Sequence, residues 1–358
     1  MMNAAFKNLF AFLHTGPRGI FLKLIVFSLL LTFIPGCSDD DDDDDDYVGN
    51  WVELSDYEGV PRSGAAVFVI DGIAYVGTGY DGTDRLTDFW KFDPDANNWT
   101  RIADFPGTAR NGAVGFSANG KGYIGLGYDG VNKLKDFYEY NPTTNTWDTI
   151  PEFGGTARYG AVAFSIDDKG YVGTGYDGSD QKDFWQYNPS SKQWTLINSI
   201  GSKRRYAVSF VIDGKAYVCT GINNGVYESD LSVYDPSTGL WTKKRAITDV
   251  SDDDYDDDYT GITGMNKVAF TVNSKGYVAT GGTGSAGTSV WEYDPSTDLW
   301  VQKTAIEASG RIEAVGFGIG SKGYITTGRS SSYYFDDLWG FKPDDEQVDL
   351  DKTSVVAP

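Results

Sequence analysis

Arginine recurs at one position in five copies of a repeating sequence pattern, and its planar guanidinium group is suited to binding carboxylates or phosphates. Each of these arginines lies six residues before a phenylalanine: Arg62, Arg110, Arg158, Arg204 and Arg311. Three copies also contain the tripeptide Tyr-Asp-Gly, which begins at Tyr80, Tyr128 and Tyr176. A tyrosine ring offers apolar contact area together with a hydroxyl group. The pattern predicts a recognition surface for an anionic ligand, provided that the fold gathers these side chains.

The same arginines have a second interpretation, as structural ion pairs. Aspartates follow the first three of them at a nearly constant interval, at Asp88, Asp136 and Asp183. Such partners are expected for buried arginines, because an unpaired charge is costly inside a protein. The sequence leaves open whether the arginines face a ligand or these aspartates.

The choice of catalytic groups is narrow. The single histidine is His14, near the N-terminus, so the rest of the chain has neither a Ser-His-Asp triad nor a histidine metal site. Glu313 follows Arg311 by two residues, which puts both side chains on the same side of a strand. Glu313 is the one candidate for a catalytic acid, and we expect no cofactor.

An acidic insertion offers the candidate ligands for a metal ion. It contains Asp252, Asp254, Asp256 and Asp258, and carboxylates are ligands that calcium prefers. The segment lacks the Asp-x-Asp-x-Asp-Gly order with a later glutamate, so a mobile acidic loop is the favoured interpretation. We expect this loop to lie over the arginines and partly neutralise them.

A ladder of tryptophans reveals the elements that must position these groups. The ladder comprises Trp51, Trp99, Trp147, Trp194, Trp241 and Trp300. Most steps are 47 or 48 residues long, and the last, which contains the acidic insertion, is 59. A repeat of this length predicts a propeller or a solenoid.

The first copy shows what one repeat contains. Apolar runs at 65–70 and 73–78 flank Asp71-Gly72, a turn signal, and predict an antiparallel pair of strands. A third run at 89–92 ends at Asp93-Pro94, before the strand that carries Trp99. Four short strands per repeat are typical of a propeller blade. Six copies align on tyrosines: Tyr75, Tyr123, Tyr171, Tyr217, Tyr277 and Tyr324.

These copies resemble the kelch repeat. Kelch blades carry a glycine pair after the second strand, an aromatic residue before an Asp-Pro turn, and a tryptophan shortly afterwards. Here the first glycine of the pair is usually threonine, as in Thr78-Gly79 and Thr174-Gly175. The resemblance covers nearly all of residues 50–343 and implies an all-β, six-bladed propeller.

The two ends of the repeat array predict how the ring closes. The sixth copy ends near Pro343 without its last strand, whereas Trp51 lies in a strand that precedes the first copy. The N-terminal strand should therefore complete the C-terminal blade, which removes an exposed sheet edge. Residues 344–358 are interpreted as an acidic, flexible tail.

The N-terminus predicts export and lipid attachment. Residues 1–36 contain basic but no acidic residues and end in an apolar run before Cys37. A small residue before a cysteine resembles the lipobox of bacterial lipoproteins, so Cys37 would carry the lipid. Eight aspartates, 39–46, follow within a charged tether at 37–49. This run resembles the export signal of Bacteroidota surface lipoproteins and implies a surface-exposed, outer-membrane location.

The formal net charge of −21 excludes nucleic acid as an expected partner. Cys219, the other cysteine, aligns with Gly77, Gly125 and Gly173 and is predicted to be a small core residue.

We expect a binding module for a glycan, an acidic peptide or a protein partner rather than an enzyme. In the kelch adaptor subunits of ubiquitin ligases, arginines and tyrosines at these positions line a pocket for acidic peptides. A kelch epimerase of N-acetylneuraminate suggests an alternative, a sugar mutarotase or epimerase. Copper oxidase chemistry of the galactose oxidase kind is excluded, because its histidine ligands have no counterpart. A structural role in the envelope is the third alternative.

Overall fold

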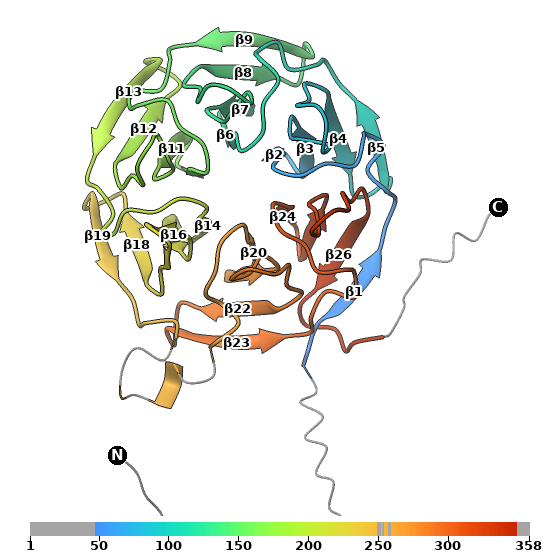
Figure 1. Cartoon of the computed structure of the whole chain (residues 1–358), viewed down its shortest axis with the longest axis vertical. Coiled ribbons are helices and arrows are strands. Elements are labelled where there is room, and N and C mark those ends of the chain that lie inside the picture. The colour runs from blue at the N-terminus through green and yellow to red at the C-terminus, as the bar shows by residue number, and fades with distance from the viewer. Residues whose placement is uncertain (1–46, 249–251, 253, 257–258, 349–358) are drawn as a thin grey trace, which may run out of the picture. The chain divides into compact units, whose positions relative to one another are not determined.

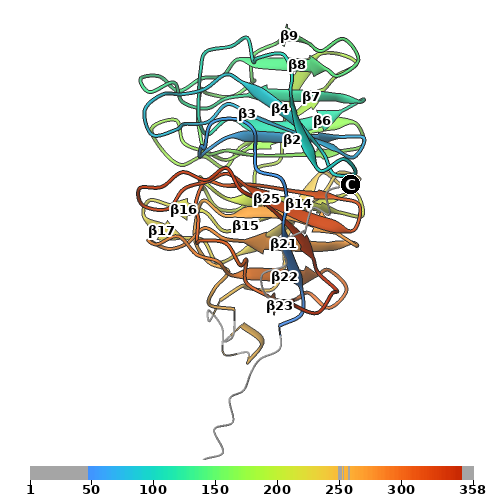
Figure 2. The same ribbon diagram turned by 90° about the vertical axis from the view of Figure 1, so that its right-hand side faces the viewer.

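The computed structural model describes residues 47–248, 252, 254–256 and 259–348. Six antiparallel sheets, each of four strands, surround a central axis as the blades of a propeller (Figure 1). In each blade the strands are called a to d from the axis outward. Figure 2 shows the ring edge-on, with blades one to three above blades four to six. The structure confirms the predicted all-β, six-bladed architecture.

The strands follow the repeat closely. Blade one contains β2 (Ala66–Ile70), β3 (Ile73–Gly77), β4 (Phe89–Asp93) and β5 (Asn98–Arg101). Blade two contains β6 (Val114–Ala118), β7 (Lys121–Gly125), β8 (Phe137–Asn141) and β9 (Thr146–Ile150). Blade three contains β10 (Val162–Ile166), β11 (Lys169–Gly173), β12 (Phe184–Asn188) and β13 (Gln193–Ile197).

The second half of the ring has the same order with one addition. Blade four contains β14 (Val208–Ile212), β15 (Lys215–Cys219), β18 (Leu231–Asp235) and β19 (Leu240–Lys243), and its b–c loop forms a small ribbon, β16 (Ile222–Asn223) with β17 (Val226–Tyr227). Blade five contains β20 (Val268–Val272), β21 (Lys275–Ala279), β22 (Val290–Asp294) and β23 (Leu299–Lys303). Blade six contains β24 (Val315–Ile319), β25 (Lys322–Thr326), β26 (Leu338–Lys342) and β1 (Asn50–Glu53).

The N-terminal strand closes the ring as predicted. β1 pairs with β26, with Trp51 opposite Phe341 and Asn50 opposite Lys342. Trp51 is fully buried, and its indole N–H donates to the carbonyl of Thr304 at 3.0 Å. The two ends of the described propeller are therefore held in one sheet.

Alternating burial explains how the blades pack. In β2 the residues Ala66, Phe68 and Ile70 are buried, and the turn to β3 uses left-handed backbone at Asp71 and Gly72. The ring of Phe68 occupies the space where a Cβ on Gly122 of the next blade would stand, 2.1 Å from the nearest ring atom. Adjacent blades thus interlock through an aromatic ring over a glycine.

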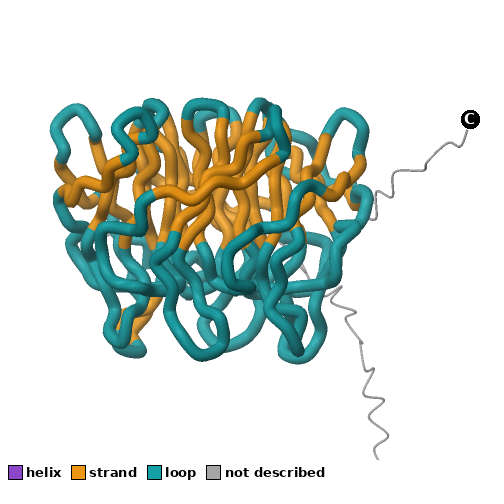
Figure 3. Tube along the Cα trace, turned by 90° about the horizontal axis from the view of Figure 1, so that it is seen from above, coloured by secondary structure: helices purple, strands orange, loops and turns teal. Residues whose placement is uncertain are grey.

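The two sides of the ring differ in their connections. The a–b and c–d connections are short turns on one side, the short-turn face, while the b–c and d–a connections are long loops on the other, the long-loop face (Figure 3). β26 runs away from the long-loop face and ends at Lys342, next to Asn50. The chain therefore enters the propeller at the short-turn face.

The acidic insertion does not cover the centre of the long-loop face. Its short 3₁₀ helix, η1 (Asp254–Asp256), lies beyond β23 at the outer edge of the ring (Figure 1). Tyr259 is buried in the same core cluster as Trp291 and Trp300. The expectation that the loop lies over the arginines is wrong for its described part, because this tyrosine anchors it to the outer strands. No helix in the described ranges is long and apolar enough to span a membrane.

Candidate ligand-binding site

Each of the five predicted arginines is buried in an ion pair with an aspartate just before strand c. The shortest N–O distances are 2.7 Å for Arg62–Asp88, Arg110–Asp136 and Arg204–Asp230, and 2.6 Å for Arg158–Asp183 and Arg311–Asp337. The arginine side chains are at most 1% exposed. These arginines therefore form structural ion pairs, because the aspartates occupy the guanidinium groups that were expected to face a ligand.

We call each of these buried Arg–Asp pairs an arginine clamp, and the pair in blade two shows what it does. Arg110 donates to the carbonyls of Thr108 and Leu126, and its guanidinium lies over the ring of Phe105. One side chain thus joins the d–a loop to strands a, b and c. In blade one, burial raises the pKa of Asp88, but the hydrogen bond and positive charge of Arg62 outweigh it and leave that pKa lowered.

The three predicted tyrosines meet at the centre of the long-loop face. They line a cavity of about 520 Å³, the central pocket, formed mainly by the b–c loops of blades six, one, two and three. Six tyrosines line it: Tyr80, Tyr128, Tyr159, Tyr176, Tyr206 and Tyr334. Among the described residues that line it, none comes from the b–c loops of blades four and five, so the wall is one-sided.

Two cations that sequence reasoning missed also line this pocket. The guanidinium of Arg85 lies between the rings of Tyr80 and Tyr128, 5.1 and 5.0 Å from their centroids. Its Nε donates to the side chain of Asn111 at 2.9 Å. Lys133 holds the corresponding place in the next loop, with its ammonium 5.6 Å from the ring centroid of Tyr176. Among the described residues, neither cation has a carboxylate within 4.0 Å.

A third cation is already neutralised. Arg329 donates to the carboxylate of Glu313 at 3.0 Å, and Ser63 donates to the same oxygen at 2.9 Å. The second oxygen of Glu313 has no hydrogen-bond donor within the described part of the chain. The predicted Glu313 therefore lies in the site, as an ion-paired carboxylate with one oxygen free to accept a hydrogen bond.

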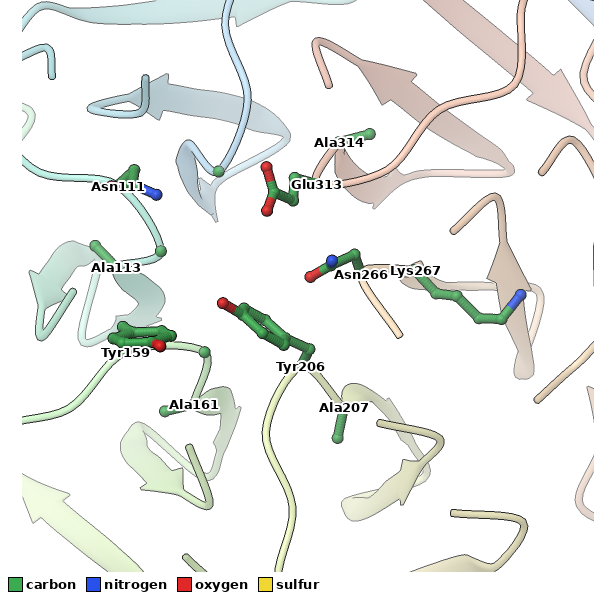
Figure 4. Close-up of a pocket in the computed structure, with 13 residues that line it drawn as sticks. Asn111, Ala113, Tyr159, Ala161, Tyr206, Ala207, Asn266, Lys267, Glu313 and Ala314 are labelled. Carbon is green, nitrogen blue, oxygen red and sulfur yellow. The ribbon is translucent and has the colours of Figure 1, made fainter. Parts of the chain in front are cut away.

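The pocket narrows to a throat of about 140 Å³ at the start of the a strands. Tyr206, Asn266 and Glu313 point into this space (Figure 4). All three have left-handed backbone, with φ of 56°, 56° and 55°. The corresponding residues of blades one to three are glycines with the same sign of φ, Gly64, Gly112 and Gly160. Burial raises the pKa of the Tyr206 hydroxyl, which therefore stays protonated at neutral pH.

The missed residues occupy positions where the copies differ. Arg85 and Lys133 each stand five residues after the predicted tyrosine, and Tyr159 directly follows a clamp arginine. A search for residues repeated in every blade selects the scaffold, whereas these loop positions vary from blade to blade. The usable signal was the pair of cations at matching places in two Tyr-Asp-Gly loops.

The other predicted sites give no metal centre or nucleophile. Within the described residues there is no cluster of three or more candidate metal ligands, and Asp258 and Cys37 lie outside those residues. Cys219 is fully buried, and burial raises the pKa of its thiol to about 12. A protonated, enclosed thiol is a core residue rather than a nucleophile.

Comparisons with known proteins agree with this architecture. The model of the kelch motif matches residues 61–106 and 203–245. Among solved structures, the one titled "Structure of YjhT" superposes with a TM-score of 0.66, is 19% identical, and covers 80% of this chain and 95% of its own. At that identity the likeness concerns the fold alone. No curated protein matches the sequence. The chain is a six-bladed β-propeller that contains kelch motifs.

Proposed function

We propose that this propeller is a binding module that holds an acidic saccharide in the central pocket. The observation that carries the proposal is the pair of unneutralised cations, Arg85 and Lys133, set among tyrosine rings. A negative group would receive charge-assisted hydrogen bonds from the free guanidinium and ammonium donors. Sugar rings carry both hydroxyls and apolar C–H faces, which suit tyrosine side chains.

The polar lining favours a saccharide over a peptide. Six tyrosines, Asn111 and the free oxygen of Glu313 face the pocket or its throat, and few apolar side chains accompany them. These groups can satisfy many hydroxyls in a small volume. The cavity lies within the size range of small-ligand sites. The chain as a whole has a net charge of −21, so these positively charged side chains set the pocket apart from the rest of the protein.

We further propose that the protein is anchored through lipid on Cys37 at the outer surface of a bacterial outer membrane. The sequence of residues 1–46 is the support for this proposal. The chain enters the propeller at the short-turn face, opposite the central pocket.

The test is binding to an array of glycans that end in uronic or sialic acids, followed by calorimetry on those that bind. Arg85→Ala with Lys133→Ala should weaken binding by at least about tenfold, since each hydrogen bond to a charged group contributes about 1.5–3 kcal/mol. Lys169→Ala with Lys322→Ala removes the same charge at the short-turn face and should leave affinity unchanged. Absence of any acidic glycan ligand, or equal affinity of the first double variant, would refute the proposal.

A second candidate function is conversion of the bound sugar by a mutarotase or epimerase reaction. The free oxygen of Glu313 and the protonated hydroxyl of Tyr206 both point into the throat, and together they could accept and donate a proton. NMR of anomer exchange in acidic sugars tests this candidate. A rate that is lost in Glu313→Gln supports it, and no acceleration by the wild-type protein excludes it.

A further inference from the structure

Two belts of backbone hydrogen bonds tie the six blades together around the axis. In the outer belt, the glycine after strand b donates its N–H to a backbone carbonyl of the next blade. The acceptor is the residue at the position of the clamp arginine, which is glycine in blade five. All six links are present, at 2.7–2.9 Å: Gly79–Arg110, Gly127–Arg158, Gly175–Arg204, Gly221–Gly264, Gly281–Arg311 and Gly328–Arg62. A Cβ on these glycines would meet backbone of the neighbouring loop, as at Gly127, where it would stand 2.9 Å from the carbonyl oxygen of Asn111.

The inner belt encircles the throat and is incomplete. Here the left-handed residue of one blade donates to the carbonyl of the same residue in the preceding blade. Five links are present: Gly64–Glu313, Gly112–Gly64, Gly160–Gly112, Tyr206–Gly160 and Glu313–Asn266. Within the described residues, the sixth, from Asn266 N–H to the Tyr206 carbonyl, is not formed. The gap lies between blades four and five.

The arginine clamp is missing at this same junction. Blade five has Gly264 where the others have arginine, and Ser289 where the others have aspartate. Lys267 substitutes in part, because its ammonium donates to the carbonyls of Gly261 and Thr280 at 3.1 and 2.8 Å. It has no carboxylate partner among the described residues.

The lost aspartate leaves a second defect in blade five. In blades one, three and six the clamp aspartate also accepts from a tryptophan indole, as Asp88 does from Trp90 at 2.8 Å. The counterpart of Trp90 is Trp291, whose buried indole N–H has no acceptor in the described part of the chain. A buried donor without a partner weakens the native arrangement.

We propose that the propeller opens locally at the seam between blades four and five, residues 204–207 and 264–267, before any other junction of the ring. Three losses coincide there: one inner-belt hydrogen bond, one arginine clamp, and the indole hydrogen bond that the missing clamp aspartate would have accepted. The 59-residue tryptophan step also makes the connection across this seam longer than the others. The free energy of a local opening depends on the interactions that the opening breaks. The junction with the fewest interactions, the seam, should therefore have the lowest free energy of opening.

Hydrogen exchange at matched amides tests the seam without any ligand. Gly221 N–H bonds across the seam at 2.8 Å, whereas Gly79 and Gly127 make the same bond at 2.7 and 2.9 Å to Arg110 and Arg158, whose clamps are complete. Residue-resolved exchange by NMR should show Gly221 exchanging at least about tenfold faster than the other two. Equal protection of the three amides would overturn the proposal.

A graft from blade two provides a gain-of-protection test. The variant Thr263→Ala, Gly264→Arg, Met265→Asn, Asn266→Gly, Lys267→Ala and Ser289→Asp restores the sequence of a complete clamp and inner belt. We expect it to bring the exchange rate of Gly221 within about threefold of that of Gly127. If the graft folds and Gly221 still exchanges fast, the cause assigned here is wrong. If it does not fold, the comparison within the wild-type protein still decides.

The seam reaches the central pocket through Tyr206, and this step rests on the proposed function. A saccharide that engages Tyr206 and Asn266 together would bridge the gap and slow exchange at Gly221. Repeating the measurement with an acidic glycan identified by the array separates the two ideas. If Gly221 exchanges fast and the glycan does not slow it, the seam is supported but its coupling to the pocket is excluded. If no glycan binds, the proposed function fails, and the exchange measured without ligand still decides whether the seam exists.

Discussion

Replacing Lys267 with methionine should make the change in the free energy of unfolding between about pH 7 and pH 9.5 about 2 kcal/mol less favourable than in the wild-type protein. The ammonium of Lys267 is buried between two carbonyls. Burial lowers its pKa from 10.5 to about 8, with only a small opposing effect from Cys219. The unfolded chain therefore holds this proton over a range in which the folded protein has released it.

The direction and size of the effect follow from those two pKa values. A group that binds protons more weakly in the folded state destabilises the protein when charged, so stability rises as pH increases from about 8 toward 10.5. At about 1.4 kcal/mol per pKa unit, the gain between about pH 7 and pH 9.5 is about 2 kcal/mol. Methionine has no charge and makes this contribution zero.

Urea unfolding followed by tryptophan fluorescence at several pH values measures the free energy of unfolding directly. The comparison should use the pH slope rather than absolute stability, because the variant also leaves the two carbonyls without a donor. Cys219 and the tyrosines whose pKa burial raises lower stability as pH rises above about 9. These groups stay protonated in both folded proteins over this pH range, so their contribution cancels in the difference between the two.

Lys303→Met is the matched control, since it removes another buried lysine that has a carboxylate partner, Glu292, at 3.4 Å. This variant should retain the wild-type dependence of the free energy of unfolding on pH. A Lys267→Met variant that gains as much stability as the wild type over this range would refute the account of Lys267 as a buried, uncompensated charge.

Two further predictions concern the scaffold. Asp136→Asn leaves Arg110 buried without its carboxylate and should lower the free energy of unfolding by about 3–5 kcal/mol. Arg101→Ala breaks an exposed pair with Asp104 and should have a much smaller effect; comparable losses would contradict the clamp. Gly127→Ala places a Cβ 2.9 Å from a backbone oxygen at a φ of 102°, while Gly225→Ala meets nothing within 4 Å at a φ of 87°. Thermal unfolding should show a clearly larger loss for Gly127→Ala, and equal losses would exclude a steric role in the outer belt.

The scaffold could be predicted because it is repeated six times. A signal too weak in one blade becomes decisive when the strand-b tyrosine and the outer tryptophan recur from copy to copy. The missing last strand of the sixth copy likewise predicted that Trp51 pairs into blade six. Repetition could not show where the clamp arginines point, because a ligand and an aspartate offer the same carboxylate chemistry.

The binding residues were harder to predict for the opposite reason. Arg85, Lys133 and Asn266 appear in one or two copies each, so they look like ordinary loop variation. Their meaning depends on the ring, which brings loops about 50 residues apart in sequence to one pocket. Tyr80, Tyr128 and Tyr176 were found because they recur, and the cations beside them were missed because they differ.

The throat also contains residues that differ between the blades. Its backbone is left-handed in all six blades, and glycine adopts that conformation without strain, as it does in blades one to three. A side chain there costs about 1 kcal/mol or more, yet blades four to six carry tyrosine, asparagine and glutamate, all pointing into the throat. Three polar groups kept at strained, adjacent positions above an incomplete belt favour a throat that contacts a ligand rather than one that only closes the ring.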